Sequence, residues 1–389
     1  MNIYIIPAWY PQDDNDITAS FFREQAHALS ERGHNVTVIH IELLSVTGVF
    51  SRPWHSKRTW QDKNVRTIFH KVIVPVPAKF SKAQDKYVSN LFYKIIRKQM
   101  QEDKKQGIAP DLIHAHVSHS CAYYCVEPAK RLGLPLVVTE HYSGLVLGIA
   151  SEKEYNKVAY TINNSDAFIF VGSNFQEFLC NKLGISKKTY VIPNMIDTNN
   201  YEVGSKTNEV FTFLTACHLK THKSVDLVVK ALHKAFHNDE NVKLMIAGDG
   251  DEYDNLKSLI EELNEESRIS MFGRYSREQS KELFSKADTF VLTSKAETFG
   301  IVYIEALASG VPCIGTKGQG ADDIIDESNG FTVDYGDVDQ LAERMQELYK
   351  NRELYKREEI RQACVDKFDK SSVCEKIEEV YKVILINGE

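Results

Sequence analysis

Paired cysteines, long apolar runs and an excess of positive charge are all missing from this sequence of 389 residues. The seven cysteines are odd in number and include no C-x-x-C pair, which disfavours both a disulfide framework and a zinc site. We therefore expect buried structural thiols in a reducing compartment. No stretch approaches about 18 consecutive apolar residues, so we expect no membrane-spanning helix.

Three further absences narrow the class of protein. The formal net charge is −7, which excludes a protein whose whole surface binds nucleic acid. Residues 1–7 lack the basic segment and the apolar core of a signal peptide, so we expect a cytoplasmic protein. No G-x-G-x-x-G follows the first apolar run, which disfavours a nicotinamide-dependent dehydrogenase.

What remains is an ordinary globular composition, with 43% hydrophobic and 26% charged residues. The chain is too long for one domain of roughly 150 residues. Short apolar runs alternate with amphipathic stretches of helical length, which predicts parallel strands covered by helices on both faces. Because this pattern restarts after Asn194, we predict two doubly wound, Rossmann-like α/β domains that face a cleft, at 1–196 and 203–368. A last helix over 371–386 is expected to pack back on the first domain.

The apolar runs define where each strand should end. In the first domain the predicted strands are 2–7, 35–41, 111–116, 134–139, 167–172 and 189–193, with a first helix at 20–32. In the second they are 210–216, 242–247, 268–273, 289–293 and 312–315, with helices near 223–237, 252–265, 277–286, 299–309 and 337–349. Ligands bind at the carboxyl ends of such strands, so the residues that follow them are the candidates for a site.

The strongest functional signal follows the predicted strand 289–293. Glu297 falls in the loop after this strand, and a helix is predicted from about Thr298. The first N–H groups of a helix form an anion site, which Gly300 would let a ligand approach closely. Glu305 lies about two turns into the helix, where a carboxylate would suit the paired hydroxyls of a ribose. Two glutamates at this spacing can also be solvated residues, and only the whole string 295–312 favours the binding interpretation.

This Glu-x7-Glu string resembles the signature of the retaining family-4 glycosyltransferases, which have the GT-B fold. Shorter strings extend the resemblance over nearly the whole chain, at 20–25, 111–116, 138–141, 191–197 and 247–250. The resemblance implies a metal-independent hexosyltransferase without cofactors, which moves a sugar with retention from a nucleotide-diphospho-sugar. UDP-sugars are the commonest donors in such families, and a glycan or a lipid-linked polysaccharide intermediate is the expected acceptor.

The resemblance also assigns donor-binding residues in the second domain. It places Glu297 at the donor sugar, Glu305 at the ribose, and Asn194 among the donor-binding residues. The N–H groups near three residues at the start of the helix are expected to face the diphosphate: Phe299, Gly300 and Ile301.

A second element, 217–224, follows the first strand of the second domain and departs from the family. Where relatives have Gly-Arg-Leu-x-x-x-Lys-Gly, this chain has a cysteine, a histidine and a serine in place of the glycine, arginine and second glycine. We expect Lys223 to stabilise the charge of the leaving diphosphate, with Lys220 as the alternative. His218 is neutral for part of the time at neutral pH, so this clamp should be weaker or pH-sensitive. Arg274 either supplies the missing charge or is a solvated loop residue.

In the first domain, His141 follows the predicted strand 134–139. The resemblance implies that it reaches the donor sugar as a catalytic residue, although a core or surface histidine is also compatible with the pattern. We expect His116 to line the cleft and His114 to pack in the sheet. The three histidines do not predict a metal site, because no carboxylates cluster with them.

The start of the first helix is the last donor-binding candidate. Ala19 takes a position where many relatives have glycine, and Ser20 follows it, so the helix N-terminus remains an anion site in weaker form. The acidic tract 13–16 before it is expected to be a solvated loop rather than a metal site.

Two stretches of the first domain combine basic and aromatic residues. One is 52–60, with Trp54 and Trp60, and the other is 87–105. A basic amphipathic helix can lie on an anionic membrane, which predicts peripheral contact with the inner face of the cell membrane. An ordinary surface helix with its apolar face in the core is the alternative. The residues concerned are Leu91, Phe92, Ile95 and Ile96 on the apolar side, and Lys94, Arg97, Lys98, Lys104 and Lys105 on the basic side.

Other functions on the same fold stay open. One is a non-catalytic GT-B partner subunit that binds a sugar nucleotide or glycan, which only His218 and the missing glycines favour. Others are a sugar-nucleotide epimerase and a phosphorylase. A glycosidase is disfavoured, because Glu297 and Glu305 would be roughly 12 Å apart if both were helical. Two-carboxylate mechanisms need about 5–9.5 Å.

Overall fold

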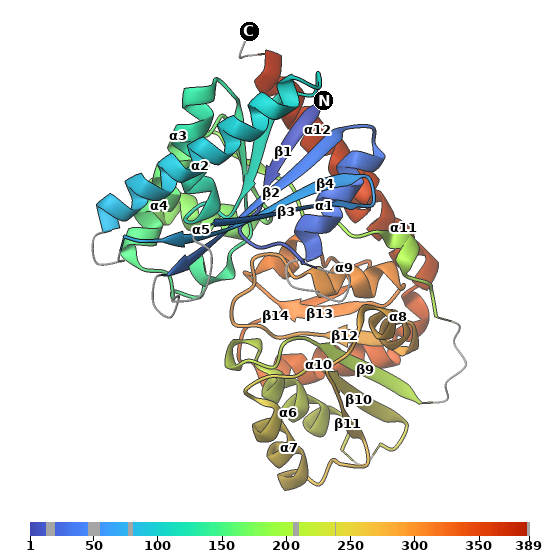
Figure 1. The fold of residues 1–389 in the computed structure, drawn as a ribbon. Helices are drawn as coiled ribbons and strands as arrows, with labels where there is room; N and C mark the ends of the chain where they lie inside the picture. Colours follow the sequence, from blue (N-terminus) through green and yellow to red (C-terminus); the bar gives the residue numbers. More distant parts are fainter. Residues whose placement is uncertain (13–19, 46–54, 77–80, 205–209, 238, 387–389) are drawn as a thin grey trace. The chain divides into compact units, whose positions relative to one another are not determined.

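The computed structural model of the protein describes residues 1–12, 20–45, 55–76, 81–204, 210–237 and 239–386. The chain folds into two units, each with its own sheet (Figure 1). Unit 1 comprises Met1–Val171, Gln176–Pro193 and Val373–Glu389, and unit 2 comprises Gly172–Phe175 and Asn194–Ser372. The segment Gly172–Phe175, which includes the start of a helix, thus belongs to unit 2, although the residues on both sides of it belong to unit 1.

The sheet of unit 1 has the strand order β3-β4-β2-β1-β5-β6-β7-β8, with β3 antiparallel to β4 and the other pairs parallel. Strands β5 and β6 are buried along their whole length, as expected where helices cover both faces of a parallel sheet. The elements are β1 (Asn2–Ile6), α1 (Ser20–Glu31), β2 (Asn35–Ser45), β3 (His55–Asp62), β4 (Val65–Val74), α2 (Ser81–Lys104), β5 (Leu112–His116), α3 (Cys121–Leu132), β6 (Leu136–Glu140), η2 (Ser143–Leu145), α4 (Glu152–Asn164), β7 (Ala167–Phe170), α5 (Ser173–Leu183), β8 (Tyr190–Val191) and α12 (Lys370–Ile386).

The hairpin of β3 and β4 was not predicted, and it makes the first sheet mixed rather than wholly parallel. Residues 55–59 of β3 are all exposed, so the strand has no apolar alternation to reveal it. Its pairing with β4, whose residues are mostly buried, holds it in the sheet. The basic and aromatic stretch at 52–60 is therefore in part an edge strand.

The sheet of unit 2 is parallel, with the strand order β11-β10-β9-β12-β13-β14. The chain moves outward from β9 to β11, then returns to β12 on the other side of β9, so the order reverses between β9 and β12. Such a switch point is where open α/β sheets bind ligands. The elements are η3 (Thr198–Asn200), β9 (Phe211–Ala216), η4 (Thr221–Lys223), α6 (Val225–Ala235), β10 (Val242–Ala247), α7 (Tyr253–Glu262), β11 (Ile269–Gly273), α8 (Arg277–Lys286), β12 (Thr289–Val291), α9 (Ile301–Ala308), β13 (Cys313–Thr316), η5 (Gly320–Asp323), β14 (Gly330–Val333), α10 (Val338–Lys350), η6 (Arg352–Leu354) and α11 (Arg357–Phe368).

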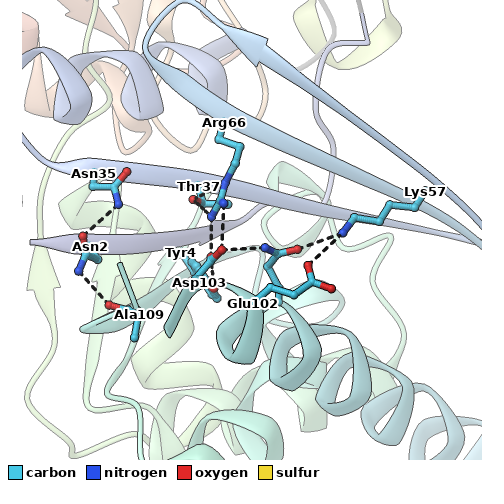
Figure 2. Close-up of polar contacts among 10 residues, drawn as sticks. Asn2, Tyr4, Asn35, Thr37, Lys57, Arg66, Glu102, Asp103 and Ala109 are labelled. Carbon is cyan, nitrogen blue, oxygen red and sulfur yellow. Dashed lines mark hydrogen bonds and ion pairs between the residues drawn. The ribbon is translucent and has the colours of Figure 1, made fainter. Parts of the chain in front are cut away.

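A buried carboxylate fastens α2 to the sheet of unit 1 (Figure 2). Asp103 is fully buried and accepts hydrogen bonds from the Tyr4 hydroxyl at 2.5 Å and from Arg66 Nη1 at 2.9 Å. Burial alone would raise the pKa of Asp103, but these donors hold it below its ordinary value. Since Tyr4 lies on β1 and Arg66 on β4, one side of α2 is fixed against the sheet.

The last helix, α12, packs on unit 1 (Figure 1). Arg32 donates to both carboxylate oxygens of Glu378, at 2.7 and 2.9 Å, and His34 lies 3.0 Å from the same group. Further along the helix the Tyr381 hydroxyl is 2.6 Å from His114 Nδ1. These contacts join α12 to β5 and to the turn after α1.

Candidate functional site

The switch point of unit 2 brings together two predicted catalytic residues. Lys223 ends η4 in the loop after β9, and Glu297 lies in the loop after β12. Lys223 Nζ is 2.5 Å from Glu297 Oε2, and the side chains are 18% and 14% exposed. Burial lowers the pKa of Lys223, but the Glu297 carboxylate more than offsets this and the net pKa is raised. The ammonium group is therefore charged at neutral pH, and a carboxylate holds it in place.

Helix α9 begins at Ile301, three residues later than predicted. Gly300 is its N-cap with φ 92 and ψ 71, in the left-handed region that favours glycine. A Cβ at Gly300 would lie 2.6 Å from the Tyr303 ring, so a side chain has no room there. The first N–H groups of α9 point out of the helix beside the Glu297 loop. Because Glu297 precedes the helix, the distance estimated from two helical glutamates does not apply.

A glycine packs against the loop that carries Glu297, and the sequence had not identified it. The Gly320 N–H donates to the Glu297 carbonyl at 3.0 Å, and Gln319 Oε1 accepts from the Glu297 N–H at 3.1 Å. A Cβ at Gly320 would meet Phe299 Cα at 2.4 Å. The start of η5 thus fixes the main chain of Glu297 and Phe299, a contact that no spacing in the sequence indicates.

Glu305 faces tyrosines. Its Oε1 accepts a hydrogen bond from the Tyr201 hydroxyl at 2.7 Å. Burial, and then the Glu305 carboxylate, raise the pKa of Tyr275. Asn194 is half-buried at the first position of the long segment of unit 2, before η3. Neither tyrosine was among the predicted site residues.

His218 and Arg274 both contact Asp249, in the loop after β10. The Nδ1 of His218 is 2.5 Å from the Asp249 carbonyl oxygen, which can only accept, so Nδ1 carries the hydrogen. Arg274 is 82% exposed and lies 3.6 Å from the Asp249 carboxylate. The Asp249 carbonyl also accepts from the Leu219 N–H at 3.0 Å, so the loops after β9 and β10 are joined.

Cys217 and Ser224 occupy positions where relatives have glycine. Cys217 is buried, and burial raises the pKa of its thiol to about 12, so it stays protonated. Ser224 adopts φ 50 and ψ 43, a left-handed conformation that glycine adopts more readily. Lys220, the alternative to Lys223, is exposed.

The histidines of unit 1 form a separate cluster at the ends of β5 and β6. His141 is half-buried, with Nε2 3.1 Å from His116 Nδ1 and its ring 5.0 Å from that of Phe21. His114 is buried in the sheet, with Nε2 2.7 Å from Thr139 Oγ1. His116 is fully buried, with the His114 ring 4.5 Å and the Phe22 ring 4.8 Å from its own, which corrects the expectation that it lines the cleft.

Burial governs the protonation of this cluster. It lowers the pKa of His114 to about 3 and that of His116 well below its ordinary value, so both rings are neutral. Glu140, the last residue of β6, accepts hydrogen bonds from the N–H groups of Ser118 and His141, each at 2.8 Å. In the described part of the chain no group of three or more His, Cys, Asp or Glu side chains is placed to hold a metal ion.

Several predicted residues lie at or beyond the edge of the described regions. Ser20 is the first residue of α1, whereas Ala19, the tract 13–16 and Trp54 lie outside the described residues.

The seven cysteines are free thiols, and all but Cys180 are buried, as expected.

The basic helix of the first domain packs in the ordinary way. Phe92, Ile95 and Ile96 of α2 are buried in unit 1, which agrees with the alternative of a surface helix whose apolar face lies in the core. Trp60 is half-buried with the Arg58 guanidinium 4.7 Å from its ring. Among the described residues, no helix is long and apolar enough to cross a membrane.

Two doubly wound sheets, with charged residues gathered at the switch point of the second, are typical of the GT-B fold. Solved structures share this fold. Sucrose-phosphate synthase from Thermosynechococcus elongatus has a TM-score of 0.74 at 17% identity, over 100% of both chains. HepE of Anabaena in complex with UDP has a TM-score of 0.73 at 16% identity, over 98% of this chain and 100% of that one.

Sequence comparison identifies the family. The model described as Glycosyltransferase Family 4 matches residues 18–200, and the model described as Glycosyl transferases group 1 matches residues 197–363. The chain belongs to the family-4 glycosyltransferases. It is 25% identical over 290 residues to N-acetyl-alpha-D-glucosaminyl L-malate synthase of Bacillus anthracis, which covers 71% of this chain and 75% of that protein. It is 28% identical over 254 residues to an uncharacterized glycosyltransferase of Methanocaldococcus jannaschii, or 65% of this chain and 69% of that one.

Proposed function

We propose that this protein is a retaining hexosyltransferase, which moves a sugar from a nucleotide-diphospho-sugar to a glycan or lipid-linked acceptor without a metal ion. The observation that carries this proposal is the Lys223–Glu297 ion pair at the switch point of unit 2, next to the start of α9. A protonated lysine and the N–H groups of a helix start are the groups that stabilise a departing diphosphate.

Each side chain has a distinct part in this proposal. Lys223 and the start of α9 bind the diphosphate and carry the charge that grows as the glycosidic bond breaks. Glu297, held by Lys223 and by the Gly320 backbone, faces the donor sugar, and Glu305 accepts hydrogen bonds from the ribose. His218 and Arg274 add positive charge near the diphosphate, and His141 reaches the donor sugar from its own unit. With these groups in place the diphosphate needs no metal ion.

A UDP-sugar is the donor class to test first. HepE was solved in complex with UDP, and the name of the Bacillus anthracis relative contains N-acetylglucosamine. UDP-N-acetylglucosamine and UDP-glucose therefore head the panel, followed by GDP- and ADP-sugars. The acceptor panel should contain free glycosides and lipid-linked saccharides.

The experiment measures donor hydrolysis and transfer for each nucleotide-sugar, with and without a chelator. We expect turnover of at least one donor, loss of turnover in Glu297→Ala, no effect of the chelator, and a product with the anomeric configuration of the donor by NMR. Donor binding without hydrolysis above the Glu297→Ala background would support a non-catalytic partner subunit instead. An epimerised sugar nucleotide as the product would identify an epimerase, and activity lost in chelator and restored by magnesium would refute the metal-free mechanism.

A further inference from the structure

Glu305 is the one charged residue of α9, whose sequence is otherwise apolar apart from a buried tyrosine. A second tyrosine, 104 residues earlier in the chain, holds its carboxylate. The Tyr201 hydroxyl donates to Glu305 Oε1 at 2.7 Å, and the Tyr201 side chain is only 2% exposed. The phenol ring is therefore packed in the protein, with its polar end on the predicted ribose ligand.

One guanidinium group contacts the main chain of both segments that carry the partners of this hydrogen bond. Arg361, on α11, donates from Nη1 to the Tyr201 carbonyl at 2.6 Å and also to the carbonyl of Ala308, the last residue of α9. Its Nη2 donates to the Thr198 carbonyl at 3.1 Å. Thr198 in turn donates through Oγ1 to Asp369 at 2.6 Å. The turn that carries Tyr201 and the helix that carries Glu305 are thus tied to the same side chain.

Carboxylate chemistry gives this hydrogen bond a consequence for binding. An ionised carboxylate has about four lone-pair sites on its two oxygens. A donor on Oε1 restricts rotation of the carboxylate, so its remaining lone pairs keep one direction. Paired hydroxyls on a ribose are recognised best by a carboxylate that is already oriented, because less rotamer freedom is lost on binding.

We propose that Tyr201 is a positioning residue, which orients Glu305 for the ribose hydroxyls of the nucleotide and so sets a preference for ribonucleotides. This inference rests on the proposed function, in which Glu305 binds the ribose. Phenylalanine would fill the same space but could not donate, so the hydroxyl alone carries the effect.

The test compares UDP with 2′,3′-dideoxy-UDP, which lacks both ribose hydroxyls, in calorimetric titrations of the full-length protein. We expect wild type to bind UDP more tightly than the dideoxy form. Tyr201→Phe should bind UDP roughly 2- to 10-fold more weakly, the range for one lost hydrogen bond. It should bind dideoxy-UDP with wild-type affinity. In a Glu305→Ala background the same substitution should have no further effect.

Tyr303→Phe is the matched control, because it removes a different buried tyrosine hydroxyl, one on α9 itself that donates to the Leu292 carbonyl at 2.7 Å. It should leave the ratio of UDP to dideoxy-UDP affinity unchanged. Equal UDP affinity in wild type and Tyr201→Phe, or an equal loss with both nucleotides, would overturn the positioning role alone. A wild type that does not distinguish the two nucleotides would refute the ribose contact of Glu305 as well. If UDP does not bind, GDP or ADP and its dideoxy form give the same comparison, since the ribose is common to all three.

Discussion

At the scale of single residues, the ion pair with Glu297 keeps Lys223 charged and in place for the departing diphosphate. Lys223 keeps its charge because Glu297 raises its pKa by more than burial lowers it. The diphosphate gains charge only as the bond to the sugar breaks, so a fixed ammonium group contributes most in the transition state. We expect Lys223→Ala to lower kcat by about 10²- to 10³-fold, with a much smaller change in the donor KM. Steady-state kinetics of transfer measure both constants.

Lys220→Ala is the control for this prediction, because Lys220 is exposed in the same loop. It should retain nearly full kcat. Thermal unfolding of Lys223→Ala is needed as well, since the substitution leaves the partly buried Glu297 carboxylate without its ion pair. An unchanged kcat with a larger KM would show that Lys223 binds the donor without assisting departure of the diphosphate.

His218 supports a second prediction at this scale. Its Nδ1 hydrogen is committed to the Asp249 carbonyl, so Nε2 can donate to a phosphate only when the ring is protonated. His218→Arg supplies a permanent charge and should therefore raise kcat/KM for the donor, which steady-state kinetics of transfer measure. An unchanged kcat/KM would exclude His218 from the diphosphate contact.

At the scale of elements, α12 is joined to unit 1 by a carboxylate that titrates at low pH. Hydrogen bonds from Arg32 outweigh burial and, with His34, lower the pKa of Glu378 from 4.5 to about 2. A carboxylate with a lowered folded-state pKa stabilises the folded protein above the unfolded value, near 4.5, and loses this contribution as the pH falls toward 2. A shift of this size corresponds to roughly 3 kcal/mol.

Glu378→Gln tests this linkage. We expect the variant to unfold at a lower temperature than wild type at pH 6 to 7, and the difference should shrink as the pH falls from about 4.5 toward 2.5. Differential scanning calorimetry at several pH values measures it. Glu375→Gln is a suitable control, because Glu375 is 65% exposed and 3.7 Å from the same arginine. A constant difference at all pH values would show that Glu378 contributes packing rather than charge.

Element prediction succeeded for most of the strands that apolar runs mark, but it missed both strands of the β3–β4 hairpin. The strand 242–247 and the helix 277–286 were predicted with the bounds that the structure has. The β3 strand was missed because its residues are exposed and polar, and only pairing with β4 holds it. Gly300 shifts the start of α9, because its left-handed conformation keeps it outside the helix.

The sequence pointed to candidate site residues, but not to the contacts between them. The resemblance to the family identified Lys223, Glu297 and Glu305 by their motifs, yet it did not pair Lys223 with Glu297, 74 residues away. It also gave no indication of Tyr201 or Gly320, whose roles depend on side-chain and backbone contacts across unit 2. Sequence spacing carries information over a few residues, whereas the switch point of a sheet assembles loops separated by whole elements.

At the scale of the whole molecule, charge is distributed unevenly, with a net charge of −7 but a basic exposed face on α2. The acidic residues of this helix face partners elsewhere in unit 1: Asp103 pairs with Arg66, and Glu102 lies 3.6 Å from Lys57 (Figure 2). Asp85 is 2.7 Å from Lys157. The exposed basic residues of the helix are Lys82, Lys86, Lys94, Arg97, Lys98 and Lys104.

A face of this kind should bind anionic membranes by charge alone. Because Phe92, Ile95 and Ile96 are buried, these apolar side chains of α2 are not available for insertion. Each basic residue near an anionic surface contributes about 1 kcal/mol, and salt screens the attraction over about 10 Å at 0.1 M. We expect the protein to co-sediment with phosphatidylglycerol-containing vesicles at low salt and to be released fully at high salt. Binding that survives high salt would indicate an inserted apolar segment.

Charge reversal tests whether α2, rather than the protein surface as a whole, binds the vesicles. Glutamate in place of Lys94, Arg97 and Lys98 together should abolish co-sedimentation and leave donor hydrolysis unchanged, because α2 carries none of the predicted catalytic or donor-binding residues. The same change of charge at exposed lysines on other helices should leave vesicle binding largely intact, the positions being Lys257 on α7, Lys350 on α10 and Lys376 on α12. If both triple variants lose binding equally, net charge rather than this face is responsible. If wild type ignores the vesicles at low salt, the helix has no membrane role, and a soluble acceptor becomes the better hypothesis than a lipid-linked one.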